Sequence, residues 1–90
     1  MLPFKQLQIN ENKKIRIFED ASQEELCWHK DHNDRLVKVM EVGNGWEVQF
    51  DDELPKPIKV GDIIKIKANV WHRILKGDDR LVIKVFEKTN

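Results

Sequence analysis

The sequence predicts an all-β fold, because short runs of alternating apolar and polar residues recur along it with turn residues between them. Residues 46–50 (WEVQF) alternate strictly, which places Trp46, Val48 and Phe50 on one face of a strand. No segment of useful length has helical periodicity. Strands spaced by roughly 8–12 residues are typical of a β-sandwich or barrel.

The expected strands alternate in the same way over six stretches, namely residues 14–19, 35–42, 46–50, 63–66, 70–75 and 81–87. Ser22 to Glu25 has the look of a capping box but leads at once into Leu26, so we expect a loop or a single turn there.

Glycine and proline mark the turns between these strands. Gly43-Asn44-Gly45 predicts a tight hairpin turn. Pro55 and Pro57 predict a loop, because proline has no amide hydrogen for a central ladder.

Length and charge limit the classes of protein to which the chain can belong. Ninety residues predict one domain, residues 1–90. The 16 basic and 16 acidic side chains cancel, so the basic excess that neutralises phosphates in nucleic-acid binders is lacking and no nucleic-acid partner is expected.

Apolar content and cysteine usage predict where the protein works. No apolar run is long enough for a bilayer span, and the first residues lack the apolar core of a signal peptide. Cys27 is the single cysteine, which rules out an intrachain disulfide and multi-cysteine zinc sites. We therefore expect a soluble, cytoplasmic protein with no membrane partner.

Three histidines supply the candidate chemistry. His29 and Asp31 share one face if residues 26–31 are extended, and His72 lies on a later strand. Two histidines and a carboxylate form a ligand set suited to Fe, Mn, Ni or Zn. His29 and His72 could instead be structural histidines, and Asp31 a carboxylate that caps a loop.

Other residues near this set have competing interpretations. His32 has the opposite parity to His29, so exposure is expected, and His32 and Asp34 are weaker ligand candidates. Arg35 and Lys38 could orient an anionic substrate, although a surface salt bridge is the simpler role for Arg35. Trp46 could stack on a ligand or lie in the core. Cys27 is expected to be a buried, inert thiol rather than a nucleophile.

From His29 onward the chain resembles the cupin superfamily. The family's second motif, G-x5-P-x-G-x2-H-x3-N, matches at Gly61 and His72, with Asn69 in place of the inner glycine, Lys67 in place of the proline and Lys76 in place of the asparagine.

The first cupin motif, G-x5-H-x-H-x3/4-E-x6-G, is matched more loosely. With Gly43 as its last glycine, His29 takes the first histidine place, Asp31 the second, and Leu36 the place of the glutamate. The stretch is also similar to small cupins with a Trp-His-x-Asp-x-x-Asp-Arg signature, seen here from Trp28 to Arg35.

The resemblance implies a cupin-type double-stranded β-helix, a small jelly-roll barrel with a divalent metal held inside by histidines of both motifs. It favours a protein that binds or transforms a small polar metabolite. The alternatives are a non-catalytic module that binds a sugar or another small molecule, and a structural dimer with a degenerate metal site. We expect a homodimer, because a barrel this small buries a modest core. Whether the chain is an enzyme is left open.

Overall fold

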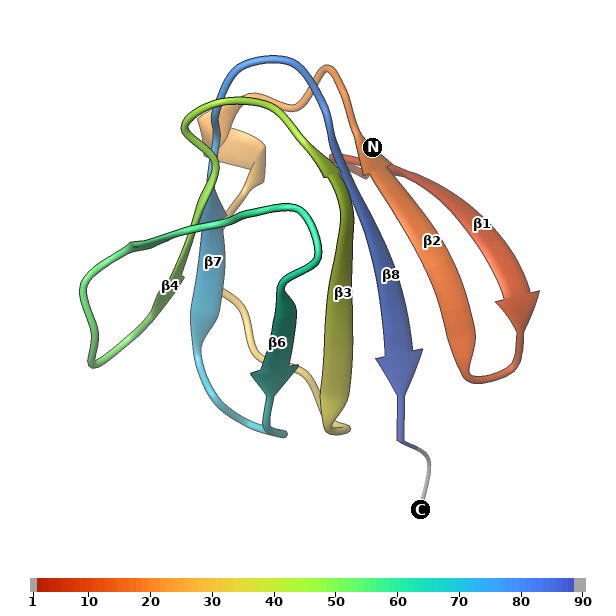
Figure 1. The fold of residues 1–90 in the computed structure, drawn as a ribbon. Coiled ribbons are helices and arrows are strands. Elements are labelled where there is room, and N and C mark those ends of the chain that lie inside the picture. The colour runs from red at the N-terminus through yellow and green to blue at the C-terminus, as the bar shows by residue number, and fades with distance from the viewer. Residues whose placement is uncertain (1, 89–90) are drawn as a thin grey trace.

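The computed structural model describes residues 2–88, and its regular secondary structure is almost entirely β-strand (Figure 1). Its elements are β1 (Lys5–Asn10), β2 (Lys13–Phe18), a single 310 turn (Gln23–Glu25), β3 (Arg35–Val42), β4 (Glu47–Phe50), β5 (Lys56–Pro57), β6 (Ile63–Ile66), β7 (His72–Leu75) and β8 (Leu81–Glu87).

The strands form two facing antiparallel sheets. The larger sheet has the order β1-β2-β8-β3-β6, and the smaller has the order β5-β4-β7. β8 is central in the larger sheet, where it pairs with β2 on one side and β3 on the other. Strands far apart in the sequence therefore lie side by side, which is how residues from both ends of the chain meet in one interior (Figure 1).

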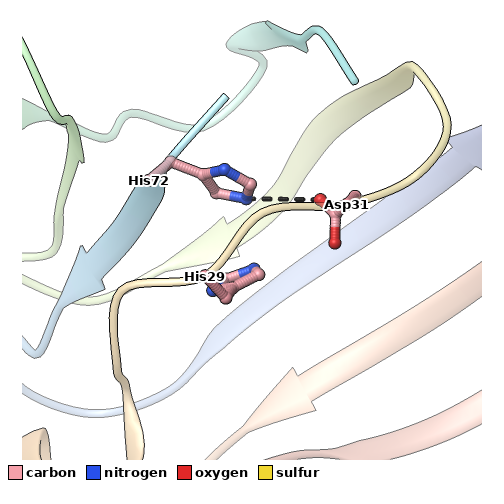
Figure 2. A group of neighbouring side chains, drawn as sticks. All are labelled: His29, Asp31 and His72. Carbon is pink, nitrogen blue, oxygen red and sulfur yellow. Dashed lines mark ion pairs between the residues drawn. The ribbon is translucent and has the colours of Figure 1, made fainter. Parts of the chain in front are cut away.

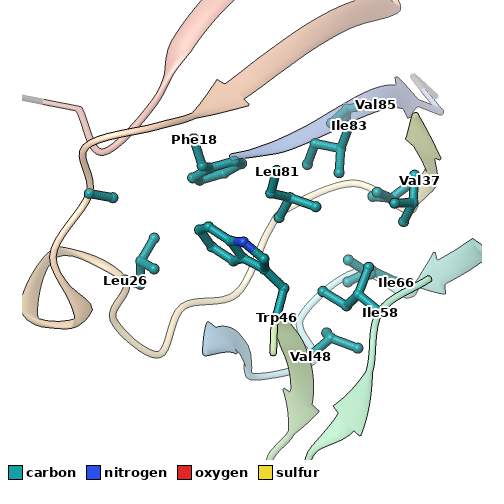
Figure 3. Close-up of a cluster of buried hydrophobic side chains, with 12 residues drawn as sticks. Phe18, Leu26, Val37, Trp46, Val48, Ile58, Ile66, Leu81, Ile83 and Val85 are labelled. Carbon is teal, nitrogen blue, oxygen red and sulfur yellow. The ribbon is translucent and has the colours of Figure 1, made fainter. Parts of the chain in front are cut away.

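The core lies between the two sheets and is built mostly from alternate residues of their strands, with further residues from the connecting segments, namely Ala21, Leu26, Trp46 and Ile58. Trp46, Leu81, Val39 and Val85 are its most completely buried large side chains, and Figure 3 shows Trp46, Leu81 and Val85 among their neighbours. Alternation within β3 and β8 explains the burial of Val39, Leu81 and Val85, since successive strand residues point to opposite faces. The indole Nε1 of Trp46 donates a 2.9 Å hydrogen bond to the Asp78 carbonyl, so its polar atom is satisfied at the edge of the core.

Most of the predicted strands are confirmed, and three of them (35–42, 63–66 and 81–87) have the predicted bounds. The single turn at Ser22–Glu25 is also confirmed, with the Ser22 amide donating to the Glu25 carboxylate. β1 was not predicted: all six of its residues are exposed, so burial imposes no clear pattern on them. The short β5 lies within the predicted proline loop and pairs with β4 at the sheet edge.

The turn at residues 43–45 is a correction to the predicted hairpin. β3 and β4 belong to different sheets and do not pair, so this turn carries the chain from one sheet to the other. Gly45 has a φ of 88°, which a glycine accommodates without strain. Gly77 lies against the same turn, and a Cβ there would be 2.4 Å from the Asn44 carbonyl oxygen. The positive φ of Gly45 and the close approach of Gly77 to this turn together allow the chain to place Trp46 in the core.

Within residues 2–88 the structure contains no helix that is long and apolar enough to cross a membrane. The cytoplasmic location stays a prediction.

Candidate metal centre

His29 and His72 are brought together by the backbone. His29 lies between the 310 turn and β3, and forms an isolated antiparallel bridge with His72, the first residue of β7. The two backbone hydrogen bonds between them measure 3.0 and 2.9 Å. Because directly paired residues project to the same face, the two rings lie together, with centroids 4.2 Å apart (Figure 2).

Both imidazoles are oriented by the same kind of hydrogen bond. Nδ1 of His29 lies 3.1 Å from the Cys27 carbonyl oxygen, and Nδ1 of His72 lies 2.8 Å from that of Val70. A carbonyl can only accept, so Nδ1 carries the hydrogen in each ring and Nε2 of a neutral ring is left with a lone pair. Metal-binding histidines typically have this arrangement.

Asp31 supplies the third group. Its Oδ1 is 3.1 Å from Nη1 of Arg35, and its Oδ2 is 3.4 Å from Nε2 of His72 (Figure 2). Oδ2 is buried and has no hydrogen-bond partner among residues 2–88. Burial lowers the pKa of His72, with a further contribution from His29, and outweighs the opposing effects of the Val70 carbonyl and Asp31. A neutral His72 offers this buried carboxylate oxygen no proton.

The geometry of the three side chains fits a divalent cation. One ligand atom from each of His29, Asp31 and His72 can be chosen so that all three lie within 4.8 Å of one another. Metal bonds of about 2.1 Å that meet at a tetrahedral angle separate two ligand atoms by roughly 3.4 Å, which matches the distance between His72 and Asp31. Two nitrogen lone pairs and a carboxylate leave further positions open for water or substrate.

A cavity of about 370 Å³ adjoins these residues. Its walls are mostly apolar and come from both sheets, with Val37, Val48, Ile66 and Ile83 among them. The three candidate ligands, Cys27, Glu25 and two arginines supply its polar groups. An apolar cavity with a few converging polar groups is typical of a small-molecule site.

The first arginine, Arg35, is fully paired. Besides Asp31 it contacts Glu87, which accepts hydrogen bonds from Nε and Nη2 of Arg35, and Lys14 lies 3.5 Å from the same carboxylate. Burial alone would raise the pKa of Glu87, but the hydrogen bond and charge of Arg35, with help from Lys14, hold this pKa below its usual range. The two positive and two negative charges balance, and they hold Asp31 in place beside His72.

The structure brings together His29, Asp31, His72 and Arg35, but not the weaker ligand candidates. His32 is exposed and lies outside the group, as its parity predicts. Asp34 is a correction: its Oδ1 accepts a 2.8 Å hydrogen bond from the Ala68 amide, so it ties two loops together. Arg35 is a second correction, since its partly buried ion pairs replace the expected surface salt bridge.

The substrate-binding role of Lys38 and the burial of Cys27 are overturned by where these side chains lie, and for Trp46 the core is the alternative that the structure supports. Lys38 lies between the inward-facing Val37 and Val39 on β3, so it points to the outer face, where it is exposed. It does not line the cavity. Trp46 is only 2% exposed and belongs to the core, not to the cavity lining. Cys27 is exposed rather than buried, and it lines the cavity.

Leu36 also lies away from the site. It pairs with Phe86 and Lys65 on the outer face of the larger sheet and does not line the cavity. The inward positions on either side of it are Arg35 and Val37. Leu36 therefore does not replace a ligand in space, although motif spacing assigns it the place of the glutamate.

The sequence reasoning missed Arg16, the second arginine of the cavity. Its position on β2 is set by parity with Phe18, which is buried in the core. That parity was the available signal. The isoleucines on either side of Arg16 are only half-buried and point to the outer face.

Comparisons with known proteins identify the fold. No protein-family model and no curated protein matches the chain. A cupin-2 domain protein from Shewanella frigidimarina aligns with a TM-score of 0.67 and 16% identity, over 94% of this chain and 79% of that chain.

Two other solved structures agree. A cupin domain from Bordetella pertussis aligns with a TM-score of 0.63 and 16% identity, over 99% of this chain and 98% of that chain. KdgF from a Halomonas species aligns with a TM-score of 0.66 and 17% identity, over 97% of this chain and 78% of that chain. The predicted cupin-type double-stranded β-helix is confirmed.

Proposed function

We propose that this chain, a small domain with the cupin fold, holds a divalent cation at His29, Asp31 and His72 and uses it to bind or transform a small metabolite in the adjoining cavity. The cation is Fe, Mn, Ni or Zn, since a set of two imidazoles and a carboxylate suits these metals.

The observation that supports this proposal is the buried Oδ2 of Asp31. It has no hydrogen-bond partner among the described residues and faces a histidine nitrogen that carries a lone pair. A buried carboxylate oxygen without a partner costs free energy. A cation bound between Asp31 and His72 would remove this cost, and His29 would complete a three-residue set.

The chain's own residues would define the reaction space. When bound, the metal would act as a Lewis acid that polarises a carbonyl or activates water. The Nδ1 hydrogen bonds to Cys27 and Val70 would hold the two imidazoles with Nε2 toward the cation. The apolar walls would exclude bulk water from a bound molecule.

The alternative function is a non-catalytic small-molecule module that works without metal. The mainly apolar lining of the cavity favours it, because such a cavity binds a small molecule by burial alone.

Metal titration of the chelator-treated protein tests the proposal. Calorimetry with Zn, Mn, Ni and anaerobic Fe(II) should show one site per chain in the wild type, and His29→Ala should weaken binding at least tenfold. His32→Ala is the matched control, because His32 is exposed, three residues away and outside the group. It should bind as the wild type does.

The outcomes separate the two functions. If the wild type binds none of the four metals, or if His32→Ala is as impaired as His29→Ala, the metal proposal is wrong. Retained binding of a small molecule in that case would support the non-catalytic module.

A further inference from the structure

Arg16 is a partly buried guanidinium that forms no ion pair among the described residues. It lines the cavity from β2, and its Nε donates a 3.0 Å hydrogen bond to Oε1 of Gln6 on β1. Its Cζ lies 4.2 Å from the ring centroid of Phe4. Within residues 2–88, no carboxylate forms an ion pair with it and its two Nη groups make no hydrogen bond.

The carboxylates nearest to Arg16 form their ion pairs with other cations and act on Arg16 only at longer range. Asp31 lies 3.1 Å from Arg35, and Glu87 lies 3.5 Å from Lys14. These two carboxylates therefore balance the charges of Arg35 and Lys14. Burial lowers the pKa of Arg16 and the charge of Arg35 lowers it further, against smaller opposing effects of Asp31 and Glu87. A guanidinium nevertheless remains protonated in proteins. A charged guanidinium without an ion-pair partner therefore lines the cavity.

We propose that Arg16 binds the carboxylate of a small organic monoanion whose apolar body occupies the cavity. The two free Nη groups match the two oxygens of a carboxylate, and a bidentate pair of this kind is strong and directional. A single negative charge neutralises Arg16, whereas a phosphate dianion would leave an excess negative charge close to Asp31 and Glu87.

The size and lining of the cavity set the rest of the ligand. About 370 Å³ lies at the small end of the range for small-molecule pockets, and the walls beyond the polar groups are aliphatic or aromatic. The inference deepens the proposed function and rests on it in one respect, that the bound anion is the molecule held beside the metal. Binding of the anion to Arg16 itself does not require the metal.

Arg73 provides a closely matched control. Its Nε donates a 2.9 Å hydrogen bond to Oε1 of Gln49, and its Cζ lies 4.7 Å from the ring centroid of Trp28. It therefore has the same kinds of partner as Arg16, an amide and an aromatic ring. It is absent from the lining of the cavity.

The test is titration of chelator-treated protein with benzoate and with hexanoate, followed by 1H–15N NMR. We expect shifts at cavity residues in the wild type and in Arg73→Gln, and affinity at least tenfold weaker in Arg16→Gln. Benzamide, which lacks the charge, and phenyl phosphate, which carries a second one, should bind more weakly than benzoate. Metal affinity should be unchanged in Arg16→Gln.

Several results would overturn the inference. One is that neither carboxylate binds the wild type at up to about 20 mM, roughly the millimolar limit of useful affinity. The others are that benzoate binds Arg16→Gln as tightly as the wild type, or that phenyl phosphate binds the wild type more tightly than benzoate does. If the wild type binds no metal, the proposed function is wrong. Binding of benzoate that depends on Arg16 would still support the inference about Arg16.

Discussion

His29 and His72 are joined by a reciprocal pair of backbone hydrogen bonds, and their rings lie 4.2 Å apart on the same side of that bridge. Each ring is also held through Nδ1 by the carbonyl two residues before it. The backbone therefore fixes the spacing and the orientation of both imidazoles before any ligand binds. Side chains ordered in advance lose little entropy on binding, which favours a preformed site.

Asp31→Asn should separate metal binding from stability. The asparagine can keep its oxygen toward Arg35 and direct its NH2 group at Nε2 of His72, where the carboxylate oxygen now has no partner. We expect the metal-free variant to unfold at a temperature no lower than the metal-free wild type, and the rise in Tm on adding metal to disappear.

Scanning calorimetry with and without each metal measures both effects. Asp34→Asn is the control, since its Oδ1 can still accept from the Ala68 amide. A metal-induced rise in Tm that persists in Asp31→Asn would show that Asp31 is not a ligand.

Two glycines should differ sharply in their tolerance of a methyl group. A Cβ on Gly77 would lie 2.4 Å from both the Asn44 carbonyl oxygen and the Trp46 amide nitrogen, which are backbone atoms with little freedom to move. Gly61 has open space around it and a φ of 87°. We expect Gly61→Ala to cost about 1 kcal/mol of strain and Gly77→Ala to cost more than about 2 kcal/mol.

Urea unfolding of both variants measures the difference. Equal costs at the two positions would mean that the loop at residues 43–45 moves away from Gly77 freely, contrary to its contacts with the core residue Trp46.

The sequence predicted the strands that bury one face and the pair of histidines that the fold brings together. Alternation identified β3, β6 and β8, because each strand places residues in the core at every second position. His29 and His72 were predicted from strand parity and from motif spacing. The parity argument for His29 requires only that the local backbone is extended, and the bridge to His72 meets this requirement.

What the sequence could not predict depends on which face of a strand is inside. In β2 the more polar face, with Lys14, Arg16 and Phe18, points inward, while Ile15 and Ile17 point outward. Apolar patterning alone favours the opposite choice. Lys38 has the opposite parity to the buried Val37 and Val39 on β3, so it points outward, away from the cavity.

Glu87 should make the stability of the protein depend on pH in the acid range. Its folded pKa is below its usual value, despite the opposing effect of burial, because of Arg35 and Lys14. Its contribution is therefore fully present above the unfolded pKa of about 4.3 and is lost as the pH falls through the folded pKa. We expect Glu87→Gln to cost about 1–3 kcal/mol at pH 7.

Unfolding in urea between pH 7 and pH 3 tests this. The difference in unfolding free energy between wild type and Glu87→Gln should stay constant above about pH 5.5 and shrink below about pH 4.3. Glu53→Gln, which breaks the exposed pair with Lys56, should cost little at pH 7. A difference for Glu87→Gln that grows as the pH falls would contradict a lowered pKa for Glu87 in the folded protein.

The homodimer stays a prediction, and the outer face of the larger sheet is where we expect it to form. Leu7 on the edge strand β1 is 60% exposed and pairs with Ile15, and Ile17 pairs with Val82 on β8, so these four side chains form an apolar surface on the face opposite the cavity. β1 is also an unpaired sheet edge, which readily pairs with a second chain.

A charge placed on this surface should dissociate the dimer, because an unpaired carboxylate is costly to bury. In sedimentation velocity at micromolar concentration, the wild type should sediment as a dimer and Leu7→Glu as a monomer. Leu54→Glu is the control, since Leu54 is 84% exposed and lies in the loop before β5, and it should remain dimeric. A monomeric wild type would rule out the dimer, and a dimeric Leu7→Glu would place its interface elsewhere.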